Sequence, residues 1–215
     1  MSKLDYKYRY RRTLPHIQPA GLTLFVTFRL FGSLPQHVLA RLHQESKKQL
    51  DAELATVSMP DSQKQTIYKE QKRLFANIDQ YLDNNSNGPH WLRETAVAEM
   101  VVQSLHYRHG QVYDLDTFCL MSNHVHLLFT PLPKENGHYH SLSSIMHSLK
   151  LYTANQANRI LNRQGAFWQH ESYDHFVRDE AELHRIRRYI LQNPVQAGLA
   201  NTWEDWPWSF TQNLS

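Results

Sequence analysis

The sequence has a single cysteine, Cys119, among its 215 residues. One cysteine excludes an internal disulfide and a zinc site made of cysteine thiolates, and this scarcity is typical of a reducing cytoplasm. The chain has 14 histidines. Any metal site must therefore use histidine, carboxylate or amide ligands.

Long apolar runs are also missing. No stretch approaches the roughly 18 apolar residues of a membrane-spanning helix, and the basic, aromatic residues 1–12 do not have the pattern of a secretory signal. Apolar residues still make up 41% of the chain, which is enough for a core and excludes wholesale disorder. The length and the lack of internal repeats predict one domain over residues 1–215.

Positive charge is concentrated at the N-terminus. Residues 1–12 carry a net charge of +4, whereas the whole chain carries +3. This basic arm, about residues 1–20, either lies along a nucleic-acid backbone, with its cations on phosphates and its tyrosines on bases, or is a solvated tail. In the first case the expected DNA contacts are Arg9, Arg11 and Arg12.

The hydropathy pattern predicts alternating strands and helices. Alternating and β-branched runs predict strands at 22–31, 112–121 and 124–130, and a short one near 175–178. Apolar stripes at helical spacing predict helices at about 92–107, from Ser141 and from Asp179. The last of these begins with an Asp-x-x-Glu capping pattern, and we expect it to stop at Pro194.

Two more helices are predicted within residues 34–89, with a break near 59–62. Without them, the order is strand, helix, strand, strand, helix, strand, helix. This order predicts an α+β fold, a ferredoxin-like antiparallel sheet (βαββαβ) with an appended C-terminal helix. The stretch of about 34–89 is then an inserted helical hairpin within one domain.

The sharpest chemical signal is a pair of histidines in the strand 124–130. Side chains alternate along a strand, so His124 and His126 share one face while Val125, Leu127 and Phe129 occupy the other. Such a pair is a ready bidentate metal site. Histidines on an apolar strand also occur as buried core residues, and the strand alone does not separate these two interpretations.

The last predicted helix carries a second signal. Tyr189 and Asn193 are four residues apart and face the same way, with Arg185 one turn earlier. A tyrosine hydroxyl can attack a phosphodiester covalently, and an amide oxygen one turn away would extend a metal shell begun by two histidines. The alternative is a tyrosine that only packs on the core. Tyr152 is a rival nucleophile, but it has no amide one turn on.

Five segments together carry a family resemblance: MSNHVHLL at 121–128, SLSSIMHSLK at 141–150, FWQ at 167–169, DHFVR at 174–178 and YILQNPVQAGL at 189–199. They resemble the REP-associated tyrosine transposases, a bacterial branch of the HUH (histidine–hydrophobic–histidine) single-tyrosine transposases. The resemblance extends over about residues 22–209. Ser122 stands where the family usually carries proline, which affects the turn and not a ligand.

The resemblance implies a chemistry and a substrate. His124 and His126 would hold a divalent metal, Mg²⁺ or Mn²⁺, with Asn193 as a third ligand and Tyr189 as the nucleophile. The implied reaction is cleavage and rejoining of single-stranded DNA with hairpin structure, in repetitive palindromic sequences, through a 5′-phosphotyrosine, in a cytoplasmic, nucleoid-associated protein. Monomer and dimer stay open. Beside the basic arm, the candidate DNA contacts are Lys150, Arg185 and Arg188.

Two other functions are compatible with the sequence. One is a domesticated protein that binds single-stranded DNA hairpins without cutting them. The other is a histidine-metal hydrolase of small molecules, which would need neither the basic arm nor a tyrosine that faces the histidines.

Overall fold

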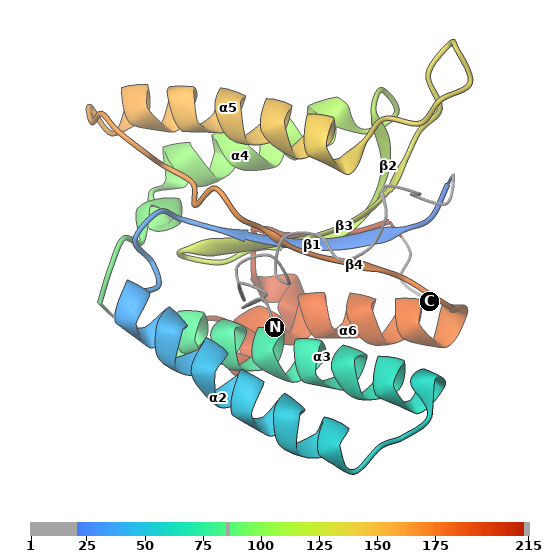
Figure 1. Cartoon of the computed structure of the whole chain (residues 1–215). Coiled ribbons are helices and arrows are strands. Elements are labelled where there is room, and N and C mark those ends of the chain that lie inside the picture. The colour runs from blue at the N-terminus through green and yellow to red at the C-terminus, as the bar shows by residue number, and fades with distance from the viewer. Residues whose placement is uncertain (1–20, 85–86, 213–215) are drawn as a thin grey trace.

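A computed structural model describes residues 21–84 and 87–212. Arg9, Arg11 and Arg12 of the basic arm lie outside the described residues. In the described part, a central sheet has helices on both faces (Figure 1). None of these helices is both long enough and apolar enough to cross a membrane.

The sheet has five strands in the order β4-β1-β3-β2-β5. Each neighbouring pair is antiparallel. This order confirms the predicted ferredoxin-like arrangement. The fifth strand extends the sheet beside β2, and it was not predicted because three residues give too short a pattern. The strands are β1 (Leu24–Arg29), β2 (Tyr113–Leu120), β3 (His124–Pro131), β4 (Tyr173–Phe176) and β5 (Ser209–Thr211).

The helices form a layer on each side of the sheet. On one face lie α4 (Thr95–Arg108) and α5 (Leu142–Ile160), and on the other lies α6 (Glu180–Gln196). The second face also carries the α2–α3 hairpin, which we define as α2 (Gln36–Ala55) and α3 (Pro60–Asn84). Two short 3-10 turns, Trp91–Arg93 and Trp203–Asp205, complete the described elements.

The predicted start of α6 is present, but its predicted end is wrong. The Asp179 carboxylate accepts a hydrogen bond from the Glu182 N–H at 2.7 Å, as a capping residue should. Pro194 does not stop the helix, which continues to Gln196. A proline lacks the N–H for one helical bond, and in the last turn this loss is small. The helix ends instead before Gly198, whose φ is +67°.

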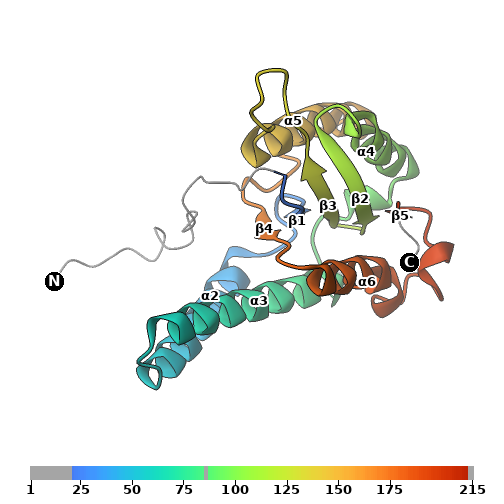
Figure 2. The ribbon, with the colours of Figure 1, turned by 90° about the vertical axis from the view of Figure 1, so that its right-hand side faces the viewer.

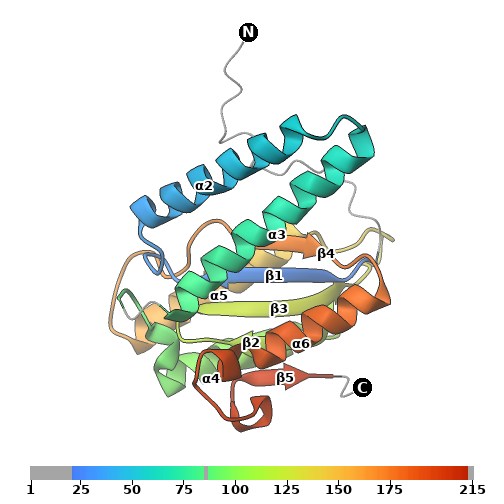
Figure 3. The ribbon, with the colours of Figure 1, turned by 90° about the horizontal axis from the view of Figure 1, so that it is seen from below.

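The α2–α3 hairpin lies beneath the sheet, and α3 runs diagonally across the strands (Figure 3). Seen from the side, α3 lies next to α6 (Figure 2). The hairpin has a small apolar cluster of its own, in which Leu34, Val38 and Leu82 are buried. The hairpin therefore holds its two helices together with its own core.

Candidate functional site

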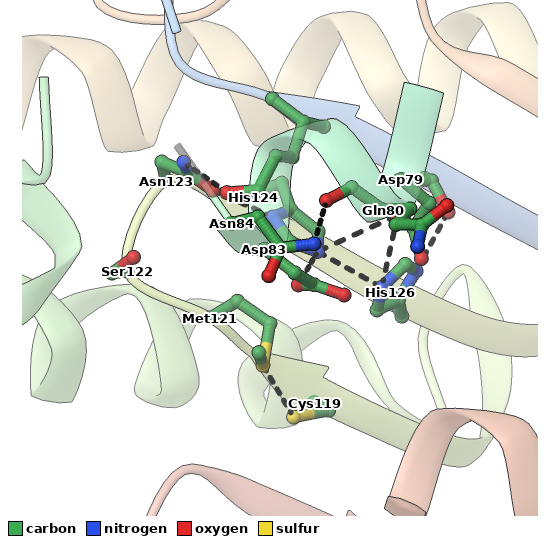
Figure 4. Close-up of polar contacts among 12 residues, drawn as sticks. Asp79, Gln80, Asp83, Asn84, Cys119, Met121, Ser122, Asn123, His124 and His126 are labelled. Atoms are coloured by element: carbon green, nitrogen blue, oxygen red, sulfur yellow. Dashed lines mark hydrogen bonds and ion pairs between the residues drawn. The ribbon is translucent and has the colours of Figure 1, made fainter. Parts of the chain in front are cut away.

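Strand β3 directs its two histidines toward α6 and α3. Val125, Leu127 and Phe129 belong to the core beneath α4 and α5, so the alternation predicted from the sequence is present. The exposed fraction of both His124 and His126 is 0%. Their Nε2 atoms are 3.0 Å apart (Figure 4).

The other ring nitrogen of each histidine is held by a neighbour. His124 Nδ1 lies 2.7 Å from the Asn123 amide oxygen. The Asn123 amide is oriented by its own Nδ2, which donates to the Leu82 carbonyl of α3 at 2.9 Å. Nδ1 of His124 therefore carries the proton, and its Nε2 has a free lone pair. Such outer partners fix the tautomer of a metal-binding histidine.

His126 Nδ1 lies 2.8 Å from the Thr27 hydroxyl on β1. A hydroxyl both donates and accepts, so Thr27 suits either tautomer of His126. Without a cation, His126 Nε2–H can donate to His124 Nε2. With a cation, the Thr27 hydroxyl can accept a hydrogen bond from Nδ1–H, which leaves both Nε2 lone pairs free.

Helix α6 brings Tyr189 and Asn193 to the histidines, as the sequence predicted. The Tyr189 ring centroid is 5.4 Å from that of His126. Asn193 is 1% exposed, and its Oδ1 accepts no hydrogen bond from any described residue. Its amide lies within hydrogen-bonding reach of both His126 and Asp79.

The inserted helix α3 adds two carboxylates that we did not predict from the sequence. Asp79 Oδ1 lies 3.4 Å from His126 Nε2 and 3.6 Å from His124 Nε2, and its Oδ2 accepts a hydrogen bond from the Tyr189 hydroxyl. Asp83 Oδ1 lies 3.8 Å from His124 Nε2. Both carboxylates point from α3 toward the histidine pair (Figure 4).

The chemistry of this cluster fits a divalent cation. Asp79, His124 and His126 offer ligand atoms that all lie within 4.8 Å of one another. Asp79 Oδ1, Asp83 Oδ1 and Asn193 Oδ1 are buried and accept no hydrogen bond within the described residues. Buried acceptors that face one another without a donor are costly, and a cation is the partner that would satisfy them. Mixed oxygen and imidazole ligands suit Mn²⁺, and Mg²⁺ also favours the oxygens.

Burial keeps the histidines neutral, as metal ligands must be. Burial, followed by the nearby His126, lowers the pKa of His124 to about 3. Burial likewise lowers the pKa of His126 to about 3. Burial and the charge of Asp79 raise the pKa of Asp83 to about 7. A cation in this cluster would counteract the rise in carboxyl pKa that burial and the neighbouring negative charge cause.

Tyr189 is held as a neutral phenol in this arrangement. Burial raises its pKa strongly, and the negative charge of Asp79, which accepts its hydrogen bond, and that of Asp83 raise it further. A phenolate beside two carboxylates is unfavourable. In this conformation Tyr189 therefore stays protonated, and a protonated phenol is a weak nucleophile.

The other predicted cations lie in different surroundings. The Lys150 ammonium donates to the backbone carbonyls of Gln169 at 2.9 Å and His170 at 3.1 Å, so it holds the loop before β4. Arg185 and Arg188 are exposed on α6. Contact of these three with DNA stays a prediction. The rival nucleophile Tyr152 is on α5, across the sheet from the histidines.

A weak signal for the two carboxylates exists in the sequence. Asp79 and Asp83 are four residues apart, so they share one side of a helix. They flank Leu82, an apolar position of that helix, so both lie near its buried stripe. Nothing in the sequence indicates which part of the sheet that stripe covers.

Comparisons with known proteins agree with the motifs. Residues 95–193 match the sequence model of the family described as "Transposase IS200 like". The chain is also similar to a Haemophilus influenzae protein named "Putative REP-associated tyrosine transposase", with 28% identity over 106 residues. That alignment covers 45% of this chain and 58% of the relative, so it spans little more than half of the relative's length.

A solved structure described as "Structure of the REP associates tyrosine transposase bound to a REP hairpin" also resembles this chain. It has 16% sequence identity and a TM-score of 0.49, over 88% of this chain and 76% of that chain. The matched family segment contains both histidines of β3 and ends at Asn193 of α6.

Proposed function

We propose that this protein is a metal-dependent endonuclease and strand transferase of single-stranded DNA. The match of residues 95–193 to the IS200-like transposases supports this proposal and agrees with the resemblance predicted from the motifs. The protein's substrates would be hairpin-forming repetitive palindromic sequences, as the relative's REP-associated name suggests. DNA binding of this kind implies a nucleoid-associated protein. One observation carries the proposal: Tyr189 and Asn193 of α6 lie on the same buried face as His124 and His126.

The four groups have separate tasks in the proposed reaction. His124, His126 and Asn193 would hold a divalent cation, Mg²⁺ or Mn²⁺. Bound there, the cation would supply positive charge to a non-bridging phosphate oxygen. Tyr189 Oη would attack phosphorus, so that the Tyr–O–P bond forms and the bond from phosphorus to the 3′ oxygen breaks. The products are a 5′-phosphotyrosine and a free 3′-hydroxyl.

The reverse step rejoins DNA without an external energy source. A 3′-hydroxyl attacks the phosphotyrosine, the phosphodiester re-forms and Tyr189 regains its proton. The forward step balances in protons, because the phenol loses one as it attacks and the departing 3′ oxygen gains one to become the 3′-hydroxyl. Asn123 and Thr27 support the reaction by keeping the imidazole rings in one orientation.

The test is a covalent adduct with DNA. Wild-type protein, a single-stranded hairpin oligonucleotide and Mn²⁺ should give an adduct on a denaturing gel. Tyr189→Phe should abolish it, whereas Tyr152→Phe should leave it unchanged, because Tyr152 is exposed on the opposite face of the sheet. Hairpin binding without an adduct under Mg²⁺ or Mn²⁺ would support a non-cleaving DNA-binding protein instead. The absence of both binding and cleavage would refute the proposal.

A further inference from the structure

The α2–α3 hairpin covers the groups that the proposed reaction needs. His124 and His126 are fully buried and Asn193 is 1% exposed. Asp79 of α3, 3% exposed, fills the space next to both histidines and to the Tyr189 hydroxyl. A DNA phosphate needs contact with the same atoms, so DNA and α3 cannot occupy this place together.

The carboxylates of α3 chemically resemble the DNA phosphate that they would exclude from the histidine pair. Asp79 and Asp83 present carboxyl oxygens to the histidine pair at 3.4 to 3.8 Å. A phosphodiester would bring an anionic oxygen to the same cluster. Asp79 also accepts the hydrogen bond of Tyr189, the hydroxyl that in the proposed reaction bonds to phosphorus. The inserted helix thus places carboxylates where the backbone of DNA would lie.

The rest of the contact between α3 and the body has an aromatic part, in which Phe75 packs on the apolar cluster of this face, and a polar end. Phe75 stacks on Tyr173 of β4, with ring centroids 4.0 Å apart. Toward the tip of the hairpin, Lys72 pairs with Glu182 of α6 at 2.6 Å. Tyr68 donates to the same carboxylate at 2.8 Å. We call Tyr68, Lys72 and Glu182 the latch.

The connections of the hairpin to the body suit movement as one piece. Leu34, Val38 and Leu82 form an apolar cluster inside the hairpin, separate from both clusters of the body. Gly32 and Gly88 stand where the chain enters and leaves the hairpin, with φ of +80° and +119°. A Cβ on Gly88 would lie 3.4 Å from the Gly32 carbonyl oxygen, so the two connections lie side by side. Paired connections of this kind allow a hinge.

We propose that the α2–α3 hairpin is an inhibitory cap, and that its Asp79 and Asp83 occupy the position of a DNA phosphate at the metal cluster. This inference rests on the proposed function. A cation held by His124, His126 and Asp79 would keep the cap closed, because its ligands come from both the sheet and α3. Single-stranded DNA binds by displacing the carboxylates, and the hairpin then lifts about its paired glycine connections.

The first test loosens the latch and measures DNA binding without cleavage. In a Tyr189→Phe background, Tyr68→Phe with Lys72→Met removes both hydrogen bonds from α3 to Glu182 and leaves the metal cluster intact. The apparent Kd equals the intrinsic Kd divided by the fraction of molecules whose cap is open, so a larger open fraction gives a lower apparent Kd. We therefore expect the Kd for a hairpin oligonucleotide, by fluorescence anisotropy with Mg²⁺, to fall by about fivefold or more.

The matched control is Lys64→Met in the same background. Lys64 lies on the same helix and, among the residues that the structure describes, pairs only with exposed Asp61, at 3.1 Å, so its loss should leave the Kd unchanged. A latch variant that folds, by circular dichroism, and binds DNA with the same Kd as its parent overturns the cap.

The second test follows the hairpin directly. Spin labels are placed at two exposed positions, Lys69→Cys on α3 and Glu180→Cys on α6. Native Cys119 does not interfere, since it is fully buried and burial raises its pKa to about 12. With Mg²⁺ alone the distribution of label distances should be narrow. Added hairpin DNA should shift it to longer distances.

The outcomes separate the two proposals. If DNA binds and forms the adduct while the label distance stays constant, the cap is refuted and the proposed function stands. If neither the parent nor the latch variant binds DNA, the proposed function fails and the cap fails with it. A longer distance that appears only with DNA supports both.

Discussion

The two faces of the sheet bury different kinds of side chain. Beneath α4 and α5, the core contains Phe118, Val125 and Phe129, with an exposed fraction of 1% or less each. On the other face, beneath α6 and α3, the residues buried as deeply include His124 and His126. Apolar burial stabilises a fold, whereas buried polar groups without partners cost free energy. The first face therefore contributes most of the stabilising burial, whereas the second combines a smaller apolar cluster with buried polar groups, at some expense of stability.

The largest expected effect is at Phe129, on the α4–α5 face. Truncating a fully buried phenylalanine removes its transfer free energy and leaves a cavity, so Phe129→Ala should lower the free energy of unfolding by about 3–5 kcal/mol. Urea denaturation of metal-free protein measures this. A loss of less than about 1 kcal/mol would show that the α4–α5 face is not the main source of stability.

On the other face, stability should depend on metal. Mn²⁺ at a hundredfold excess over its Kd should stabilise the wild type by about 2.7 kcal/mol, as expected for a ligand that binds only folded protein. His126→Ala should lose most of this gain, because it removes one ligand atom. The readout is the Tm with and without Mn²⁺.

His147→Ala is the control for the metal measurement. His147 is exposed on α5 of the opposite face, so its loss should leave the Mn²⁺-dependent shift unchanged. An equal shift in wild type and His126→Ala would rule out the histidine pair as a metal site.

The cost of the buried carboxylates should appear as a pH dependence. Asp83 has a pKa of about 7 in the fold, above the value of about 3.9 in an unfolded chain. A carboxyl group with a raised pKa favours folding while protonated, so metal-free protein should lose stability as the pH rises from about 4 through 7. Asp83→Asn should flatten this slope and raise stability at pH 8, on the order of 2 kcal/mol.

Denaturation between pH 4 and 8 with a chelator present measures the slope. The exposed Asp61 of the same helix provides a control, since Asp61→Asn should keep the wild-type slope. A slope that persists in Asp83→Asn would assign it to another group.

The smallest expected effect concerns the attachment of α6 to the sheet. Arg187 makes two hydrogen bonds to Asp116, at 2.8 and 2.5 Å, and both side chains are largely buried. A double-mutant cycle with Arg187→Met and Asp116→Asn should give a coupling of about 1 kcal/mol. A coupling near zero would mean that apolar packing alone positions Tyr189.

The sequence was sufficient for those features that depend on local periodicity. Strand alternation placed His124 and His126 on one face, and helical spacing placed Tyr189 beside Asn193. The order of strands and helices led to the ferredoxin-like sheet. Each of these depends on neighbours in the chain, which a single sequence displays.

The features that were missed depend on packing between distant segments. Asp79 meets His126 only because α3 crosses the sheet, and 46 positions separate the two residues. The role of Asn123 depends on the Leu82 carbonyl of that same helix. At Pro194 the error was local. A proline in the final turn costs the helix little stability when its one backbone hydrogen bond is lost, so it does not mark the end of a helix. The sequence also did not indicate that the Lys150 ammonium holds the loop before β4, and the contact of Lys150 with DNA stays a prediction.

The close approach of Gly32 and Gly88 also bears on how such a domain can evolve. Because the chain leaves the body and returns to it at nearly the same point, the segment between them can be gained or lost without moving β1 or α4. Insertions with adjacent ends disturb a host fold little. The α2–α3 hairpin could thus have been added to an existing sheet domain in a single genetic step, and the same geometry would let an engineer exchange it for a short turn.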